Sequence, residues 1–203
     1  ERIGQIPGVS AVSEANLIPL GGDSLLRSFH PAGRTDIPGT RPSTYSVGPS
    51  FFRTLGIQVL QGREFDRTHR AGTQPVAIVN ETFARTYFPN QDVIGQRVQT
   101  EDEADAEVIG LVRDHRIGTI GEAPQSVIYY PFAQRPRTLI VHARSTSPDG
   151  LVPAVQRAID EIVATVPVSV QTLRSATSLE MNMRRLGTML MGAMGAVGLL
   201  LAM

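Results

Sequence analysis

The chain has 203 residues and carries 19 basic and 19 acidic side chains, so its formal net charge is zero. A neutral chain has no overall field that recruits nucleic acid or anionic lipid, and no Lys/Arg cluster with interleaved aromatic residues marks a local nucleic-acid surface. The absence of cysteine excludes disulfides, thiolate metal sites and a cysteine nucleophile. Because the sequence starts without a methionine and ends inside an apolar run, we expect it to be a piece of a longer protein.

The first 43 residues predict a helix end, a strand and then a loop. Apolar side chains recur at helical spacing until Pro7 and Gly8 interrupt the pattern, and an extended pattern then continues to Leu20. Residues 21–43 are rich in Gly, Pro, Arg, Ser and Thr and show no sustained period, which is typical of a loop. This loop has room for one strand around residues 25–29.

A strand and a short helix are expected next. Alternation through Tyr45 and Val47 predicts the strand. Pro49 can begin a helix, because its missing amide costs nothing in the first turn, and Gly56 is a natural helix end. Residues 57–60 then lead into a turn.

The most informative passage, residues 74–98, predicts a strand, a two-turn helix and a turn. Residues 76–79 form an unbroken apolar run typical of a buried strand, although periodicity alone leaves a buried helical turn open. The side chain of Asn80 can cap the following helix, and Glu81 places negative charge at the positive end of the helix dipole. Pro89 cannot extend the helix and ends it.

Three further strands follow in the second half of the chain. Residues 107–113 and 126–130 are apolar on both sides and are predicted as interior strands, with Asp114 and His115 at the end of the first. Residues 137–144 alternate, which places Leu139, Val141 and Ala143 on one side and Ile140, His142 and Arg144 on the other.

The sequence then predicts a helix, whose first residue it leaves undecided, and a last strand. Apolar side chains from Val155 to Val163 recur at helical spacing. Ser147 followed by proline makes a good cap, but Pro153 would then lie inside the helix, so the start stays open. Pro167 ends the helix, and the alternation in residues 168–172 predicts a strand.

The final segment is physically distinct. Residues 186–203 are 18 consecutive uncharged residues, preceded by Arg184 and Arg185, and this length is the minimum for a membrane span. Its four glycines are ordinary in a closely packed membrane helix. We expect the start of a transmembrane helix, while a buried C-terminal helix remains the alternative.

The four histidines do not form a recognisable catalytic or metal site. They are dispersed, without an HExxH motif, a second histidine at helical spacing or a cysteine, and structural or solvated roles are favoured. These residues are His30, His69, His115 and His142.

Other chemical signatures are also missing. The sequence has no Gly-x-Ser-x-Gly elbow and no phosphate-binding loop, so any ATP hydrolysis must take place elsewhere. An acidic segment could bind a hard cation but lacks the alternating ligands and turn glycine of a calcium loop, so a solvated turn is favoured. Its residues are Glu101, Asp102, Glu103 and Asp105. We therefore assign no catalytic, cofactor-binding or metal-binding residue.

Seven aromatic residues are either an exposed patch for a partner or part of the core. The core is favoured, because a chain with only seven Phe and four Tyr needs these rings for burial. The residues are Phe51, Phe52, Phe83, Tyr87, Phe88, Tyr129 and Tyr130.

Several of these motifs together carry a family resemblance. Their order resembles the MacB-like periplasmic core domain of bacterial ABC transporter permeases, from about Thr44 onward, while residues 21–43 carry no part of it. No single motif is a catalytic signature, and the specificity lies in their joint occurrence. The motifs are YSVGPSFFRTLG at 45–56, GREF at 62–65, the passage 74–98, IGLVRD at 109–114 and VIYYPF at 127–132.

The resemblance implies an α+β extracytoplasmic domain with two lobes. Residues 1–60 and 137–174 would form a porter-like lobe of β-α-β units, and residues 61–136 a small inserted α/β lobe. Residues 175–185 would connect the domain to the start of a transmembrane helix at 186–203.

The resemblance also implies a function without catalysis in this domain. It would couple ATP-driven movement of membrane helices to export or other extracytoplasmic events by mechanical transmission, on the periplasmic side of the bacterial inner membrane. Its expected partners are an ABC ATPase domain or subunit, a like or unlike second permease bound through the membrane part, and a periplasmic adaptor or substrate. No cofactor and no nucleic acid are expected.

Two other classes of protein stay open. One is a binding module in which residues 21–43 and the inserted lobe hold a lipid, peptide or lipoprotein without mechanical coupling. The other is a secreted hydrolase whose site has no recognisable motif. The transported substrate and the identity of the periplasmic partners do not follow from the sequence.

Overall fold

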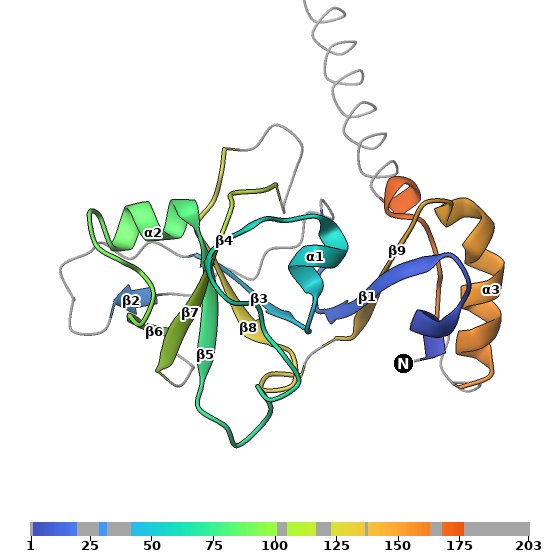
Figure 1. The fold of residues 1–203 in the computed structure, drawn as a ribbon, viewed down its shortest axis with the longest axis horizontal. Coiled ribbons are helices and arrows are strands. Elements are labelled where there is room, and N and C mark those ends of the chain that lie inside the picture. The colour runs from blue at the N-terminus through green and yellow to red at the C-terminus, as the bar shows by residue number, and fades with distance from the viewer. Residues whose placement is uncertain are drawn as a thin grey trace, which may run out of the picture.

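A computed structural model describes most of the chain before residue 177. The described residues are 2–19, 29–31, 42–100, 105–116, 123–136, 138–162 and 168–176. They form a mixed α/β fold around a single nine-stranded sheet (Figure 1). Its strand order is β2-β6-β7-β5-β8-β3-β1-β9, and β4 pairs with β7.

The strands are β1 (Val9–Ala15), β2 (Phe29–Pro31), β3 (Ser43–Val47), β4 (Val59–Gly62), β5 (Val76–Asn80), β6 (Arg97–Thr100), β7 (Ala106–Val112), β8 (Val127–Pro131) and β9 (Ile140–Ser145). The helices are the 3-10 helix η1 (Arg2–Gln5) and the α-helices α1 (Phe51–Leu55), α2 (Glu81–Tyr87) and α3 (Pro148–Asp160).

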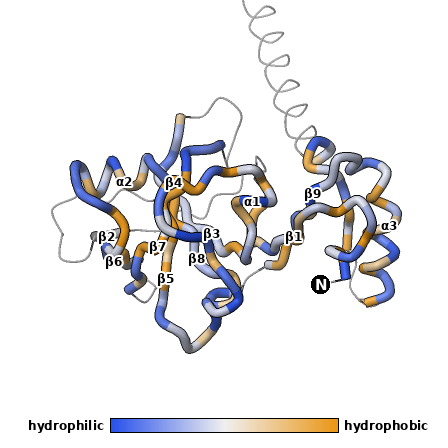
Figure 2. The backbone as a smooth tube through the Cα atoms, in the orientation of Figure 1, coloured by the Kyte–Doolittle hydropathy of each residue, from blue (hydrophilic) through white to orange (hydrophobic). Residues whose placement is uncertain are grey.

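Strand β5 lies in the middle of the sheet, as its unbroken apolar run predicts. It pairs with β7 in parallel and with β8 antiparallel, and all five of its residues are buried. Ile78 belongs to a core cluster beside α1 on one face, and Val79 to a second cluster beside α2 on the other. Figure 2 shows the hydrophobic colour running along this central part of the sheet. The open alternative of a buried helical turn is therefore wrong here.

Helix α2 confirms the predicted boundaries. The Asn80 side chain accepts a hydrogen bond from the amide of Phe83 at 3.1 Å, and Glu81 occupies the first turn. The helix ends at Tyr87, two residues before Pro89. These local signals depend on neighbours within one helical turn, which is why the sequence alone could show them.

Helix α1 differs from its prediction at the start. Pro49 does not begin it: the helix starts at Phe51, after Ser50 in a left-handed conformation with φ of 63°. The predicted end is confirmed, since Gly56 is left-handed and its amide bonds to carbonyls of the last turn.

Helix α3 shows where the helix that includes Val155 begins, which the sequence left open. It begins at Pro148, with Ser147 as the N-cap residue, and continues through Pro153. Pro153 is exposed, so its ring lies on the solvent side of the helix and the lost amide bond is not a buried defect.

The predicted strand at residues 168–172 is wrong. These residues belong to no strand, and the carbonyl of Val168 instead accepts a hydrogen bond from Nε2 of Gln156 on α3 at 3.2 Å. Alternation alone does not make a strand, because the segment must also find an edge that pairs with its backbone.

The predicted strand at β9 is confirmed, but its more apolar side is the exposed one. Ile140 and His142 on one side are half-buried, and the ring of His142 lies 5.9 Å from that of Phe51 in α1. On the opposite, more apolar side, Leu139 is 60% exposed and Val141 42%.

The sheet joins the two sequence ranges that were expected to form separate lobes. Strand β3 from the first range pairs with β8 from the inserted range over five residues. In contrast, β1 pairs with β3 only at Ala15 and Val47, and β9 pairs with β1. The boundaries of the lobes stay a prediction.

Several other expectations fall on residues outside the described ranges. These include the strand around residues 25–28, most of the acidic segment, most of the connector and the apolar tail at 186–203. Among the described residues, no helix is both long and apolar enough to cross a membrane.

Candidate functional site

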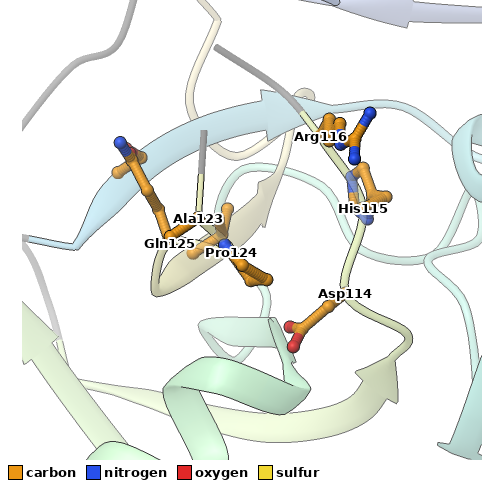
Figure 3. Close-up of a pocket in the computed structure, with 8 residues that line it drawn as sticks. Asp114, His115, Arg116, Ala123, Pro124 and Gln125 are labelled. Atoms are coloured by element: carbon orange, nitrogen blue, oxygen red, sulfur yellow. The ribbon is translucent and has the colours of Figure 1, made fainter. Parts of the chain in front are cut away.

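A pocket of about 190 Å³ opens where β7 ends and where β3 and β8 begin (Figure 3). Figure 3 shows His115 and Arg116 across the opening from the segment 123–125, with Asp114 below them. The lining residues are Ser43, Asp114, His115, Arg116, Ala123, Pro124, Gln125 and Val127.

Asn80 braces the base of this site through both ends of its amide. Its Nδ2 donates to Oδ1 of Asp114 at 2.7 Å and to the carbonyl of Gln125 at 2.8 Å. Its Oδ1 accepts from the amides of Phe83 at 3.1 Å and Val127 at 2.9 Å. One side chain therefore links the end of β5, the start of α2 and the start of β8.

Asp114 is held as a carboxylate by the start of α2. Oδ1 accepts from the Thr82 amide at 2.8 Å, and Oδ2 accepts from the Thr82 hydroxyl at 2.7 Å and from Nη2 of Arg85 at 2.8 Å. Burial raises the pKa of Asp114, but the hydrogen bonds from Thr82 and Arg85 and the charge of Arg85 outweigh it and lower the pKa. The carboxylate is charged at neutral pH and already satisfied.

His115 connects the pocket to the core. Its Nδ1 lies 3.0 Å from the carbonyl of Arg113, and its Nε2 lies 2.8 Å from the hydroxyl of Tyr129. A carbonyl can only accept, so Nδ1 carries the proton and Nε2 accepts from Tyr129. Burial lowers the pKa of His115, against the opposing effects of the Arg113 carbonyl and Asp114, and this keeps the ring neutral.

Tyr129 donates the hydrogen bond that joins its hydroxyl to Nε2 of His115. Burial, together with Tyr45 and Asp114, raises the pKa of Tyr129 well above its ordinary range, so the hydroxyl keeps its proton. The ring is fully buried in the same cluster as Phe51 and Phe52.

The hydrogen bonds at this site hold the surrounding strands and α2 together, and they are not arranged to activate a nucleophile. The Ser43 hydroxyl donates to Oε1 of Gln125 at 3.3 Å, while both ring nitrogens of His115 are engaged with Arg113 and Tyr129. A triad would need the histidine to face the hydroxyl, and this contact is not among those made by the described residues.

The other histidines do not join this site. His69 is 7% exposed and lies 3.0 Å from Asp66 and 2.9 Å from Arg63. Nε2 of His142 lies 2.9 Å from the carbonyl of Leu17, and burial lowers the pKa of His142 despite this hydrogen bond. For His30 the structure describes the backbone in β2 but not the side chain.

The described residues contain no group of three or more His, Asp or Glu side chains that could hold a metal ion. Of the acidic segment, only Asp105 is described, and its Oδ2 accepts a hydrogen bond from Nε of Arg97 at 2.5 Å. Glu101, Asp102 and Glu103 lie outside the described ranges, so the solvated turn stays a prediction.

All seven aromatic residues that could have formed an exposed patch are buried, which confirms their prediction as core. Phe51, Phe52 and Tyr129 pack on the α1 side of the sheet. Phe83, Tyr87, Phe88 and Tyr130 pack on the α2 side.

The role of Asn80 and Asp114 as a pair was missed. The sequence indicated Asn80 only as a cap and placed Asp114 at a strand end. One signal could have found the pair: each follows a buried apolar strand, and polar residues after neighbouring parallel strands meet at one sheet edge.

Comparison with solved structures supports the fold. The periplasmic region of MacB from Actinobacillus actinomycetemcomitans matches with a TM-score of 0.56 and 13% identity, over 82% of this chain and 81% of that chain. The extracellular domain of the noncanonic ABC-type transporter YknZ from Gram-positive bacteria matches with a TM-score of 0.54 and 16% identity, over 81% and 82%. Comparison with curated protein sequences finds no match.

The sequence model of the MacB-like periplasmic core domain matches residues 2–162. This range includes every strand of the sheet and α3. The chain therefore belongs to the family of MacB-like periplasmic core domains.

Proposed function

We propose that this chain is the periplasmic part of an ABC transporter permease and couples ATP-driven movement of membrane helices to export or other extracytoplasmic events. ATP hydrolysis would take place on a separate nucleotide-binding domain or subunit. The membrane part, starting at residues 186–203, would pair with a like or unlike permease, and an adaptor or substrate would meet the domain outside the membrane.

The position of the two ends of the described chain supports this proposal. Helix η1 contacts α3, and Arg2 Nη1 lies 3.6 Å from Glu161 Oε2 just after α3. At the other end, Val168 bonds to Gln156 of the same helix. Figure 1 shows η1 beside the lower end of α3 and the turn at 173–176 beside its upper end, both on the same side of the molecule. Both ends of the described chain therefore contact the same helix, so a movement of either connection would act on α3.

The sheet provides a route from this end to the pocket. Strands β1 and β9 are paired over most of their length, and β1 reaches β3 at Ala15 and Val47. In our proposal these two strands, η1 and α3 belong to the porter-like lobe of residues 1–60 and 137–174, which moves together with the inserted lobe of residues 61–136. Displacement of the connector would reach the inserted lobe through β3, which pairs with β1 at one edge and with β8 over five residues at the other.

Replacing residues 176–182 with a Gly/Ser stretch of equal length, in the complete permease with its ATPase, tests mechanical coupling. Such stretches behave as flexible coils, so ATP hydrolysis should persist while transport is lost. A Glu/Ala/Lys helical stretch of the same length is the matched control and should retain transport, because it stays semi-rigid. Full transport with the Gly/Ser stretch would instead support the alternative of a tethered binding module.

A further inference from the structure

We propose that the side chain of Asn16 is a positioning residue that fixes the terminal unit of the domain in one orientation against the rest of the sheet. The terminal unit comprises η1, β1, β9 and α3. The role of Asn16 in transmitting movement from α3 rests on the proposed function, whereas its role in holding the terminal unit stands without it.

Strand β1 joins the rest of the sheet through a short antiparallel ladder with β3. The amide of Gly48 donates to the carbonyl of Glu14 at 2.7 Å. On the other side of the single strand pair, the amide of Asn16 donates to the carbonyl of Ser46 at 3.0 Å. In a regular antiparallel ladder the Ser46 amide would then donate back to the Asn16 carbonyl, because two residues opposite each other exchange both bonds.

The side chain of Asn16 takes the place of that carbonyl. Its Oδ1 accepts a hydrogen bond from the Ser46 amide at 2.8 Å. Strand β1 ends at Ala15, so the backbone leaves the ladder at Asn16 while the side chain supplies its third bond. Ser46 is only 3% exposed, and loss of Oδ1 would leave a buried amide without this acceptor.

Packing supports the terminal unit from one face of the sheet. Helix α1 contacts β1 and β9, and its Arg53 carbonyl accepts a hydrogen bond from Nη1 of Arg144 at 3.1 Å. On the opposite face of β9, Leu139 and Val141 are exposed. The ladder therefore has a large share in resisting rotation of the terminal unit, and Asn16 provides the bond of this ladder that a side-chain substitution can remove.

The test uses spin labels on Thr86→Cys in α2 and Arg157→Cys in α3, in the complete permease with its ATPase. The chain has no cysteine of its own, both residues are exposed, and Figure 1 shows the two helices at opposite ends of the molecule. Pulsed EPR measures the distribution of distances between the labels, without nucleotide and with ATP plus vanadate. With Asn16 present, the distribution should be narrow and equal in both states, because the ladder fixes the two ends relative to each other.

Asn16→Ala should widen this distribution even without nucleotide. Hydrogen exchange of the peptide segment that contains the Ser46 amide should become up to about tenfold faster at that amide, because its hydrogen bond is lost. Asn16→Asp keeps the acceptor and should restore both values. Asn16→Leu has a similar volume without the acceptor and should behave like Asn16→Ala, so it decides the question if Asn16→Ala does not fold.

Asp92→Ala is the matched control. Oδ1 of Asp92 also accepts from a backbone amide, that of Ile94 at 3.0 Å, but in the turn between α2 and β6. This variant should leave the distribution narrow. An unchanged distribution in folded Asn16→Ala or Asn16→Leu, a wide distribution in Asn16→Asp, or equal widening by Asp92→Ala overturns the proposal.

The two nucleotide states separate this proposal from mechanical coupling. Widening in Asn16→Ala that changes with ATP and vanadate supports both, because movement at the terminal unit then no longer reaches the inserted lobe unchanged. Widening that is the same in both states supports the role of Asn16 in holding the terminal unit and contradicts the ATP-driven movement of the proposed function.

Discussion

At the scale of single residues, Asn80 is the point where three elements meet. It caps α2 and also bonds to Asp114, to the carbonyl of Gln125 and to the amide of Val127, although it is only 1% exposed. Four hydrogen bonds to a buried amide make it more than a helix cap, because removing the side chain leaves several buried groups without partners.

The variant Asn80→Ala should lower the free energy of unfolding by about 2–4 kcal/mol, from the lost cap and the unsatisfied groups. Chemical denaturation measures this difference. Gln91→Ala, at an exposed turn position, is the control and should change stability by no more than about 0.5 kcal/mol. Similar small changes in both variants would mean that water replaces the Asn80 amide without cost.

His115 makes stability dependent on pH. Its folded pKa is lowered from 6.5 by burial, so the unfolded chain binds more protons than the folded chain just below pH 6.5. Stability is therefore complete above that pH and is lost as the pH falls towards the lowered folded pKa. His142, whose pKa burial also lowers, acts in the same direction.

His115→Gln should reduce the slope of unfolding free energy against pH in the range just below pH 6.5, since one histidine contributes at most about 1.4 kcal/mol per pH unit. Denaturation curves at several pH values measure both slopes. The lowered pKa of Asp114 acts in a more acidic range, below its ordinary value of 3.8, and does not interfere. Identical slopes in the two proteins would show that His115 is not linked to folding.

At the scale of elements, the antiparallel pairing of β4 with β7 depends on Gly62. Gly62 lies opposite Gly110 in this pair, beside an irregularity in the register. Gly62 has a positive φ of 71°, and an added Cβ would collide with the carbonyl oxygen of Ile109. Close backbone approach, as well as backbone conformation, therefore requires glycine at this position.

Gly62→Ala should lower the free energy of unfolding by at least about 2 kcal/mol more than Gly72→Ala does, because the collision adds to the conformational strain. Gly72 is a matched control: its φ is 83°, and an added Cβ there meets no atom within 4 Å. Thermal denaturation of both variants measures this difference in stability. Equal destabilisation would mean that β4 moves away from β7 without cost.

At the scale of the whole molecule, the exposed large apolar side chains of the described residues lie outside the range 42–136. The described part of the chain between residues 42 and 136 has no exposed large apolar residue, whereas the segments before and after it have six. They are Ile18, Leu139, Val141, Ile162, Val168 and Leu173. The end that carries η1, β9 and α3 is thus the less fully packed part of the fold.

Truncation after Arg185 should give a folded monomer without detergent, because the two core clusters lie entirely before this point. The 203-residue chain should associate through its apolar tail. Size-exclusion chromatography with light scattering measures both states. A monomeric 203-residue chain and a precipitating truncated chain would show that residues 186–203 belong to the folded core.

The sequence by itself determined the features that depend on near neighbours. The buried run before Asn80, the cap at Asn80 and the helix end before Pro89 follow from contacts within a few residues. The burial of the aromatic residues also followed, because a chain with few large rings needs them in its core.

Only the tertiary structure decided which distant segments meet. Asn80 and Asp114 are 34 residues apart and come together because β5 and β7 pair in parallel. It also decided which side of β9 is covered and that residues 168–172 join no strand. The physical reason is that alternating apolar and polar residues define two faces of a strand, but they do not specify the partner strand or the face that is covered. All available sheet edges and surfaces compete for these contacts as the core packs.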